Sequence, residues 1–337
     1  MAQYLTNIAG NDALRGRLAA DILSGSFAHA YIIEGREGSG RHALAYNLAA
    51  ALCCFDKHSD TFPCLACEAC RKVLENKTPD VILVGLEDDR VTIGVEAARF
   101  IRQDAMVVPN DFEHKIYIIE NADLMTEQAQ NALLLTLEEP HSYAVFFLLC
   151  ESASSLLETV RSRAPIIRTE PLTDKQLYEY LIANDSRAES MAANDADQFS
   201  AILRESAGCI GRAQFLLDPK KSKAESERHA TAEALINVFA QKASVIPRAR
   251  LIKEFPTKRN DAIAVLSAAS LAIRDLIALK KSDTAPLCFY GDREAATELS
   301  YRFTLSALFN LYQRIDNSIN SLSRNANVRL TITSLIQ

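Results

Sequence analysis

The sequence predicts an α/β fold, a parallel sheet covered by helices, followed by regions that are helical throughout. Short apolar runs alternate with helix-forming stretches across residues 28–170, as in sheets whose strands are joined by crossover helices. Beyond residue 221 the apolar residues recur at helical spacing. The 337 residues are too many for one ordinary core. We therefore expect two or three domains.

The composition is that of a soluble globular protein with an acidic balance. The chain is 48% hydrophobic and 24% charged, with a net charge of −6. This charge provides no overall basic field, so any contact with nucleic acid would be local or shared with partners. The sequence shows no signal peptide and no apolar run close to membrane-spanning length. We expect a cytoplasmic location and no membrane contact.

The first elements of the chain are a helix, a strand and a glycine-rich turn. Residues 11–24 form an amphipathic helix, and residues 31–33 form a short apolar strand. The turn holds glycines at the spacing of the P-loop motif G-x-x-x-x-G-K-[ST], and a helix then runs to about residue 52. In a P-loop, backbone N–H groups and the positive end of the helix hold a phosphate group. The residues of this candidate site are Gly35, Gly38, Ser39 and Gly40. A glycine turn here is also common without a ligand, so both interpretations stay open.

The two positions that complete the P-loop motif depart from it. Arg41 stands where lysine would reach the phosphates, and the two side chains are not interchangeable. His42 stands where a hydroxyl would bind Mg²⁺, and neutral imidazole is a poor ligand for this oxygen-preferring ion. The sequence thus indicates a retained scaffold and a lost catalytic metal site.

Four cysteines follow the P-loop helix within a short polar stretch. They are Cys54, Cys64, Cys67 and Cys70, the last three spaced C-x2-C-x2-C. Four thiolates can close a tetrahedron around Zn²⁺ and leave no open position for chemistry, so the predicted role is structural. Free thiols and an iron–sulfur cluster remain alternatives. Cys53 could replace Cys54 as a ligand, and His58 lies in the same loop.

Strands and helices continue to alternate after the cysteines. We expect a strand at 80–86, a helix at 92–106 with Met106 facing inward, and a buried strand at 116–119. The buried strand ends at Glu120 and Asn121, where an ATPase of this type has Asp-Glu to hold Mg²⁺ and orient water. Like the P-loop, this second motif has therefore lost residues that hold Mg²⁺ and support hydrolysis.

A helix and a strand come next, and the residues after that strand differ from those of an ATPase for a third time. A Thr-capped helix at 126–139 is stopped by Pro140, and a strand follows at 144–149. A nucleotidase of this architecture would then place a polar group against the γ-phosphate. The sequence offers Cys150, Glu151 and Ser152 instead.

Farther on, helices are expected at 230–239, 262–279 and 300–323.

Together these residues resemble the clamp-loader ATPases of bacterial DNA polymerase III, within the AAA+ class. The matching stretches are HAY (29–31), the glycine loop, PCLACEAC (63–70), IIENADLMTEQAQNALLLTLEEP (118–140) and SRA (162–164). The resemblance covers about residues 5–220. It implies three domains: an AAA+ domain over residues 1–170 with a zinc-binding module at 54–70, a helical lid over 171–220, and a helical C-terminal domain over 221–337 that joins a five-subunit ring. It also implies other clamp-loader subunits, the sliding clamp and primed DNA as partners.

The family contains ATP-hydrolysing motor subunits and subunits with damaged motifs, and this chain is most similar to the second kind, the delta-prime subunits. For such a chain ATP and Mg²⁺ are doubtful ligands. The resemblance implies that Arg163 is an arginine finger that reaches the ATP of a neighbouring subunit, although Ala164 replaces the usual cysteine. It also matches Arg212 to the lid arginine that senses nucleotide; an ordinary surface charge is the alternative for either arginine. A motor subunit and a zinc-dependent nucleic-acid-binding module remain alternative functions.

Overall fold

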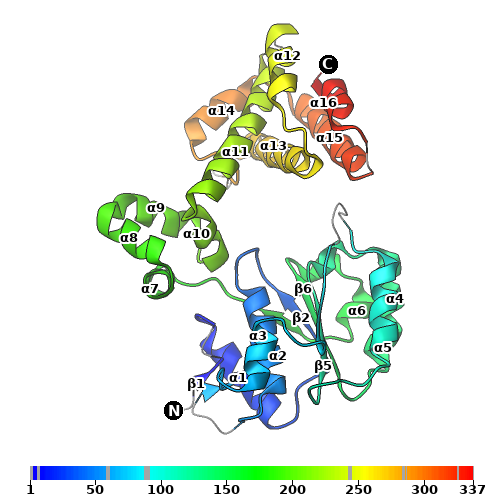
Figure 1. Cartoon of the computed structure of the whole chain (residues 1–337). Helices are drawn as coiled ribbons and strands as arrows, with labels where there is room; N and C mark the ends of the chain where they lie inside the picture. Colours follow the sequence, from blue (N-terminus) through cyan, green and yellow to red (C-terminus); the bar gives the residue numbers. More distant parts are fainter. Residues whose placement is uncertain are drawn as a thin grey trace. The chain divides into compact units, whose positions relative to one another are not determined.

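The structure is a computed structural model that describes most of the chain in two compact units. The described residues are 3–5, 8–57, 61–86, 92–241, 245–282, 285, 287–324 and 326–336. The units comprise residues 1–218 and 219–337 (Figure 1). The further boundary near residue 170 stays a prediction. His58 lies outside the described residues.

A five-stranded sheet forms the centre of the first unit. Its strands, in spatial order, are β4 (Val81–Val84), β5 (Lys115–Ile119), β6 (Ala144–Cys150), β2 (Ala30–Glu34) and β7 (Ile166–Arg168). Every neighbouring pair is parallel. All residues of β5 and β6 are buried, because parallel strands joined by crossover helices have both faces covered. The predicted α/β fold with a parallel sheet is confirmed.

Helices cover both faces of this sheet, and each face has its own hydrophobic core. One core packs the sheet against α1 (Asp12–Leu23), α2 (Arg41–Cys53) and α3 (Glu68–Leu74). The other packs it against α4 (Val95–Asp104), α5 (Glu127–Glu138) and α6 (Glu158–Arg161). Figure 1 shows the two helical layers on opposite sides of the strands. A small parallel pair, β1 (Gln3–Tyr4) and β3 (Thr61–Phe62), lies apart from this sheet.

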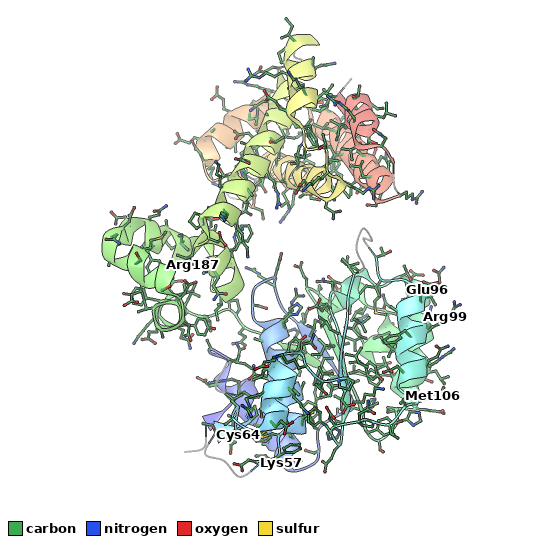
Figure 2. The ribbon with its side chains drawn as sticks, viewed as in Figure 1. Lys57, Cys64, Glu96, Arg99, Met106 and Arg187 are labelled. Atoms are coloured by element: carbon green, nitrogen blue, oxygen red, sulfur yellow. The ribbon has the colours of Figure 1, made fainter. Side chains whose placement is uncertain are left out.

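One predicted inward residue points the other way. Met106 lies beyond the end of α4 and is 66% exposed. Figure 2 shows it with Glu96 and Arg99 along the outer side of this helix (Figure 2). The expectation for Met106 was wrong because the helix ends at Asp104, so helical spacing no longer applies there.

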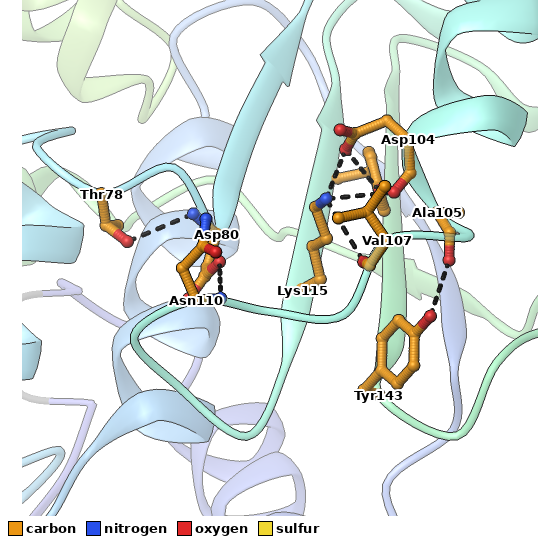
Figure 3. A network of polar contacts seen from close by, with 9 residues as sticks. Thr78, Asp80, Asp104, Ala105, Val107, Asn110, Lys115 and Tyr143 are labelled. Carbon is orange, nitrogen blue, oxygen red and sulfur yellow. Dashed lines mark hydrogen bonds and ion pairs between the residues drawn. The ribbon is translucent and has the colours of Figure 1, made fainter.

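A buried carboxylate fixes the loop that leads into β5. Asp80 is fully buried and accepts backbone N–H bonds from Asn110 (2.7 Å), Asp111 (2.6 Å) and Phe112 (3.0 Å). Figure 3 shows this contact beside a second one, in which Lys115 bonds the Asp104 carboxylate at 2.9 Å (Figure 3). Buried charge is tolerated where it is hydrogen-bonded and paired.

We expect Asp80→Ala to lower the free energy of unfolding by about 3 kcal/mol, because three loop N–H groups lose their acceptor. Asp111→Ala is the matched control, since the Asp111 side chain makes a partly exposed contact with Lys72 at 3.7 Å. Surface pairs of this kind contribute about 0–1 kcal/mol. Urea unfolding of the full chain measures both changes. If both variants lost the same free energy of unfolding, the Asp80 carboxylate would not be what holds the loop.

Four helices follow the sheet within the first unit. They are α7 (Asp174–Asn184), α8 (Ser186–Asn194), α9 (Ala196–Glu205) and α10 (Ile210–Leu216). They enclose a separate small core that contains Leu177, Leu181 and Phe199. Thr173 and Gln176 form a capping box at the start of α7, which fixes where this helical region begins.

The described part of the second unit is helical, as predicted. Its helices are α11 (Pro219–Ala240), α12 (Val245–Glu254), α13 (Arg259–Leu279), α14 (Arg293–Tyr301), α15 (Leu305–Ser323) and α16 (Val328–Ile336). The predicted helix at 300–323 is interrupted, because Thr304 caps a new helix through a bond from the Ala307 N–H at 3.1 Å.

Helix α13 is long and apolar enough to cross a membrane by length and composition. This differs from the sequence expectation that no apolar run approaches that length. In the structure α13 supplies the centre of the second unit's hydrophobic core, with Val265, Leu266, Ile273 and Leu276 fully buried. A core helix meets the same criteria.

Candidate functional site

The predicted P-loop connects β2 to α2 at the carboxyl edge of the sheet. Gly38 and Gly40 have φ values of 75° and 90°, which favour glycine. A Cβ on Gly35 would lie 2.0 Å from the Thr169 Oγ1 atom. The Ser39 hydroxyl is 2.8 Å from the same Thr169 oxygen. The glycines are therefore required by this loop, whether or not it holds a ligand.

Helix α10 packs its backbone directly on the P-loop. The Gly211 N–H donates to the Gly38 carbonyl at 3.0 Å, and a Cβ on either glycine would come within 2.8 Å of the other segment's backbone. A cavity of about 320 Å³ lies beside this contact, lined by the loop, the start of α2 and the helical region. Tyr180 and Gln214 are among its lining residues.

Arg41 is buried at the start of α2. The residue is 5% exposed, and its Nη1 atom is buried without a hydrogen-bond partner among the described residues. A guanidinium donor is rarely left unpaired in this way. The helix start also carries partial positive charge, so the arrangement suits an anion.

His42 and Glu120 contact one another. The His42 Nδ1 atom is 2.8 Å from a Glu120 carboxylate oxygen. These are the positions at which a nucleotidase would hold Mg²⁺ through a hydroxyl and an acid. Glu120 follows β5 and lies close to Gly85, where a Cβ would be 3.1 Å from its other oxygen. The His42 imidazole and the Glu120 carboxylate therefore contact each other at the place where both would face a metal ion.

Asn121 and the Cys150 segment complete the edge of the sheet. Asn121 has a φ of 48° and begins a short 3-10 turn. Cys150 is fully buried, and burial, with the charges of Asp123 and Glu34 added, raises the pKa of its thiol to about 12. Cys150 therefore stays neutral. Glu151 and Ser152 come directly after it, at the end of β6.

Glu34, at the end of the P-loop strand, was not predicted as part of this edge. Its carboxylate accepts bonds from Arg168 Nε at 2.7 Å and from the Ala153 N–H at 3.1 Å. Burial alone would raise its pKa, but these two hydrogen bonds outweigh burial and lower it. The sequence could not show this contact, because it depends on the pairing of β2 with β7, which sets Glu34 opposite Arg168.

The two predicted arginines both pair with acids of this chain. Arg163 follows α6, and its guanidinium contacts the Glu138 carboxylate and bonds the Thr159 carbonyl at 2.7 Å. Arg212, in α10, pairs with Glu205 at 2.8 Å and lies over the Phe215 ring. Arg212 is not among the residues that line the 320 Å³ cavity.

The four predicted cysteines come together as one cluster. The Sγ atoms of Cys54, Cys64, Cys67 and Cys70 all lie within 4.8 Å of one another. A tetrahedral Zn–S₄ site with bonds near 2.3 Å needs sulfur–sulfur distances of about 3.8 Å. The Cys64–Cys70 distance is already 4.0 Å. The cluster can hold a metal ion such as zinc.

Backbone N–H groups point at these sulfurs. Cys64 N donates to the Cys54 sulfur at 3.5 Å, and Cys67 N to the Cys64 sulfur at 3.3 Å. Such bonds orient and stabilise thiolate ligands. Cys53 lies outside the cluster, and burial, followed by the charge of Asp80, raises its pKa to about 12. The donor set therefore fits a four-cysteine site built on Cys54.

Comparison with known proteins shows what the first part of the chain is similar to. Residues 10–173 match the family described as "DNA polymerase III, delta subunit". The Bacillus subtilis DNA polymerase III subunit delta' is 32% identical over 47% of this chain and 47% of its own length. The Escherichia coli subunit delta' is 32% identical over 59% of this chain and 58% of its own length. The chain thus spans about half the length of these relatives.

Another relative and a solved structure are also similar. The Bacillus subtilis DNA polymerase III subunit tau is 30% identical over 48% of this chain and 28% of its own length. A gamma-subunit-related protein from Thermotoga maritima aligns over 95% of this chain and 96% of its own, with 18% identity and a TM-score of 0.44. The chain is thus similar in sequence to both delta' and tau subunits of DNA polymerase III.

Proposed function

We propose that this chain is a clamp-loader subunit of the AAA+ class, most like the delta-prime subunits of DNA polymerase III, and that it works in loading the sliding clamp without hydrolysing ATP. It acts as a stator-like structural subunit of a five-subunit ring in the cytoplasm. Its partners are the other clamp-loader subunits, the sliding clamp, and primed DNA through the assembled complex.

The contact between His42 and Glu120 is the observation that carries this proposal. At 2.8 Å the imidazole and the carboxylate satisfy one another in the place where Mg²⁺ would bind. Mg²⁺ prefers oxygen ligands in strict octahedral geometry, and a nitrogen at this position does not meet that demand. Asn121, beside Glu120, has no carboxylate to orient water. Without the metal and the base, phosphoryl transfer loses its main sources of charge stabilisation.

We expect the purified chain to release no phosphate from Mg·ATP above the rate of a protein-free sample. Equilibrium binding of Mg·ATP, measured in the same samples, separates an empty P-loop from a nucleotide-sensing one. Arg41→Ala is the variant to compare for binding, because the unpartnered Arg41 Nη1 atom suits a phosphate group. Steady phosphate release that Glu120→Gln abolishes would overturn the proposal and favour the motor-subunit alternative.

The proposed contribution of this chain to ATP hydrolysis is Arg163, supplied to a neighbouring subunit. A cation supplied across a subunit boundary stabilises the charge that develops on the transferred phosphoryl group. Arg163 is 32% exposed and held by Glu138 of its own chain, so its guanidinium lies near the surface with its geometry fixed. The neighbour's phosphate would compete with Glu138 for it.

The four-cysteine cluster is proposed to bind Zn²⁺ in a structural role. A metal at this cluster would cross-link the end of α2 to α3. A zinc-dependent nucleic-acid-binding module remains the second candidate for this insertion. Tight DNA binding by the isolated chain, with a steep dependence on salt, would favour that candidate.

A further inference from the structure

The second unit contains a cavity that the proposed function does not use. It has a volume of about 540 Å³ and lies where α12 leads into α13 and where α16 begins. This volume falls within the range of roughly 300–1,000 Å³ that is usual for small-molecule sites. All of its lining residues belong to the second unit.

The charges around this cavity are all of one sign. Lys253, Arg259 and Arg329 line it, and no Asp or Glu is found among its described lining residues. None of these three cations forms an ion pair with an acid in the described part of the chain.

The acids nearest in sequence are engaged elsewhere. Glu254 pairs with Arg250 at 2.9 Å, one turn back along α12. Asp261 contacts Arg228 of α11 at 3.4 Å. The cations of the cavity are therefore left uncompensated by their sequence neighbours, and a negatively charged ligand would supply the missing charge.

Two further features favour an anion inside the cavity. The Arg259 Nε atom is buried and has no hydrogen-bond partner among the described residues. Arg259 is also the first residue of the 21-residue helix α13, whose N-cap residue Lys258 makes no side-chain capping bond. The first-turn N–H groups of α13 thus add partial positive charge next to the guanidinium.

The cavity also has an apolar wall. Phe255 and Ile332 contribute to its lining and are 4% and 1% exposed. A ligand that fits both features carries phosphate on an apolar or aromatic body. We propose that this cavity binds a nucleoside phosphate, with its phosphates on Arg259, Arg329 and Lys253 and its base against the apolar wall. A compact cavity suits such a molecule better than an extended nucleic-acid strand, which needs a groove.

The test is isothermal titration of the full chain with ADP, GDP and tripolyphosphate at about 0.15 M salt, with adenosine as the uncharged probe. We expect the nucleotides to bind and adenosine to bind far more weakly. Arg259→Ala and Arg329→Ala should each weaken nucleotide binding by about tenfold or more, as loss of a charge-assisted hydrogen bond does. Thermal unfolding of each variant checks that it is folded. Arg329 is exposed, so its substitution spares the core.

Lys280→Ala is the matched control, because it removes one positive charge from the far end of α13, outside the cavity. It should leave binding unchanged. Arg41→Ala separates this cavity from the P-loop: nucleotide binding lost in Arg41→Ala and kept in Arg259→Ala would overturn the proposal. So would an absence of binding up to about 1 mM. Binding of a single-stranded oligonucleotide without binding of ADP, GDP or tripolyphosphate would also overturn it, in favour of a nucleic-acid surface.

Discussion

Replacing Arg163 by alanine is expected to lower ATP hydrolysis by a reconstituted clamp-loader assembly by about 10³-fold or more, while this chain still assembles. The reason is that a cation supplied in trans contributes roughly 10³–10⁵ to phosphoryl transfer rates in other systems. The measurement is steady-state phosphate release with the sliding clamp and primed DNA present. Gel filtration of the same sample checks assembly.

The matched control for Arg163 is Arg161→Ala. Arg161 ends α6 two residues earlier and is exposed, so its loss removes the same charge from the same segment. It should leave hydrolysis near the wild-type rate. An Arg163→Ala assembly that hydrolyses ATP normally would show that Arg163 serves only its own chain, through its contact with Glu138.

Substituting one cysteine of the cluster is expected to release the metal and to destabilise the first unit by more than about 4 kcal/mol, as loss of a structural metal does. Cys67→Ala is the suitable variant, because Cys67 caps α3 through a bond from the Cys70 N–H at 3.4 Å. Elemental analysis of the purified chain measures the metal, and thermal unfolding measures the stability. Prolonged treatment with a strong chelator should reproduce the loss.

Cys53→Ala is the control for this experiment and identifies the fourth ligand. Cys53 is adjacent to Cys54 but lies outside the cluster, so the variant should keep one equivalent of zinc. Loss of zinc in Cys53→Ala with retention in Cys54→Ala would reverse the assignment. Finding iron instead of zinc, together with visible absorption by the protein, would favour the alternative of an iron–sulfur cluster.

Most of the sheet could be predicted from the sequence because its buried strands are continuous apolar runs. The expected strands at 31–33, 116–119 and 144–149 all lie within β2, β5 and β6. The three-residue strand β7 was not predicted individually, since so short a run has no periodicity to detect. Helices α12 and α16 were also missed. Both are short and lie beside loops, where local pattern is weak.

The residues of the candidate site could be predicted, but not their contacts. The sequence placed His42 and Glu120 at altered motif positions, and their pairing depends on how β2 and β5 are spaced across β6. Likewise Arg163 was recognised by its motif, while its contact with Glu138 depends on where α5 ends relative to α6. The cysteine cluster was predictable because its ligands lie close together in sequence.

The contact of Gly38 with Gly211 restricts how this protein can change. The two residues lie 173 positions apart, yet a methyl group on either would come within 2.8 Å of the other segment's backbone. A substitution at one position therefore requires the other segment to shift. In a chimera that joins this P-loop to the helical region of a relative, any larger residue at the second position would push the two segments apart. Grafting experiments should therefore exchange both segments together.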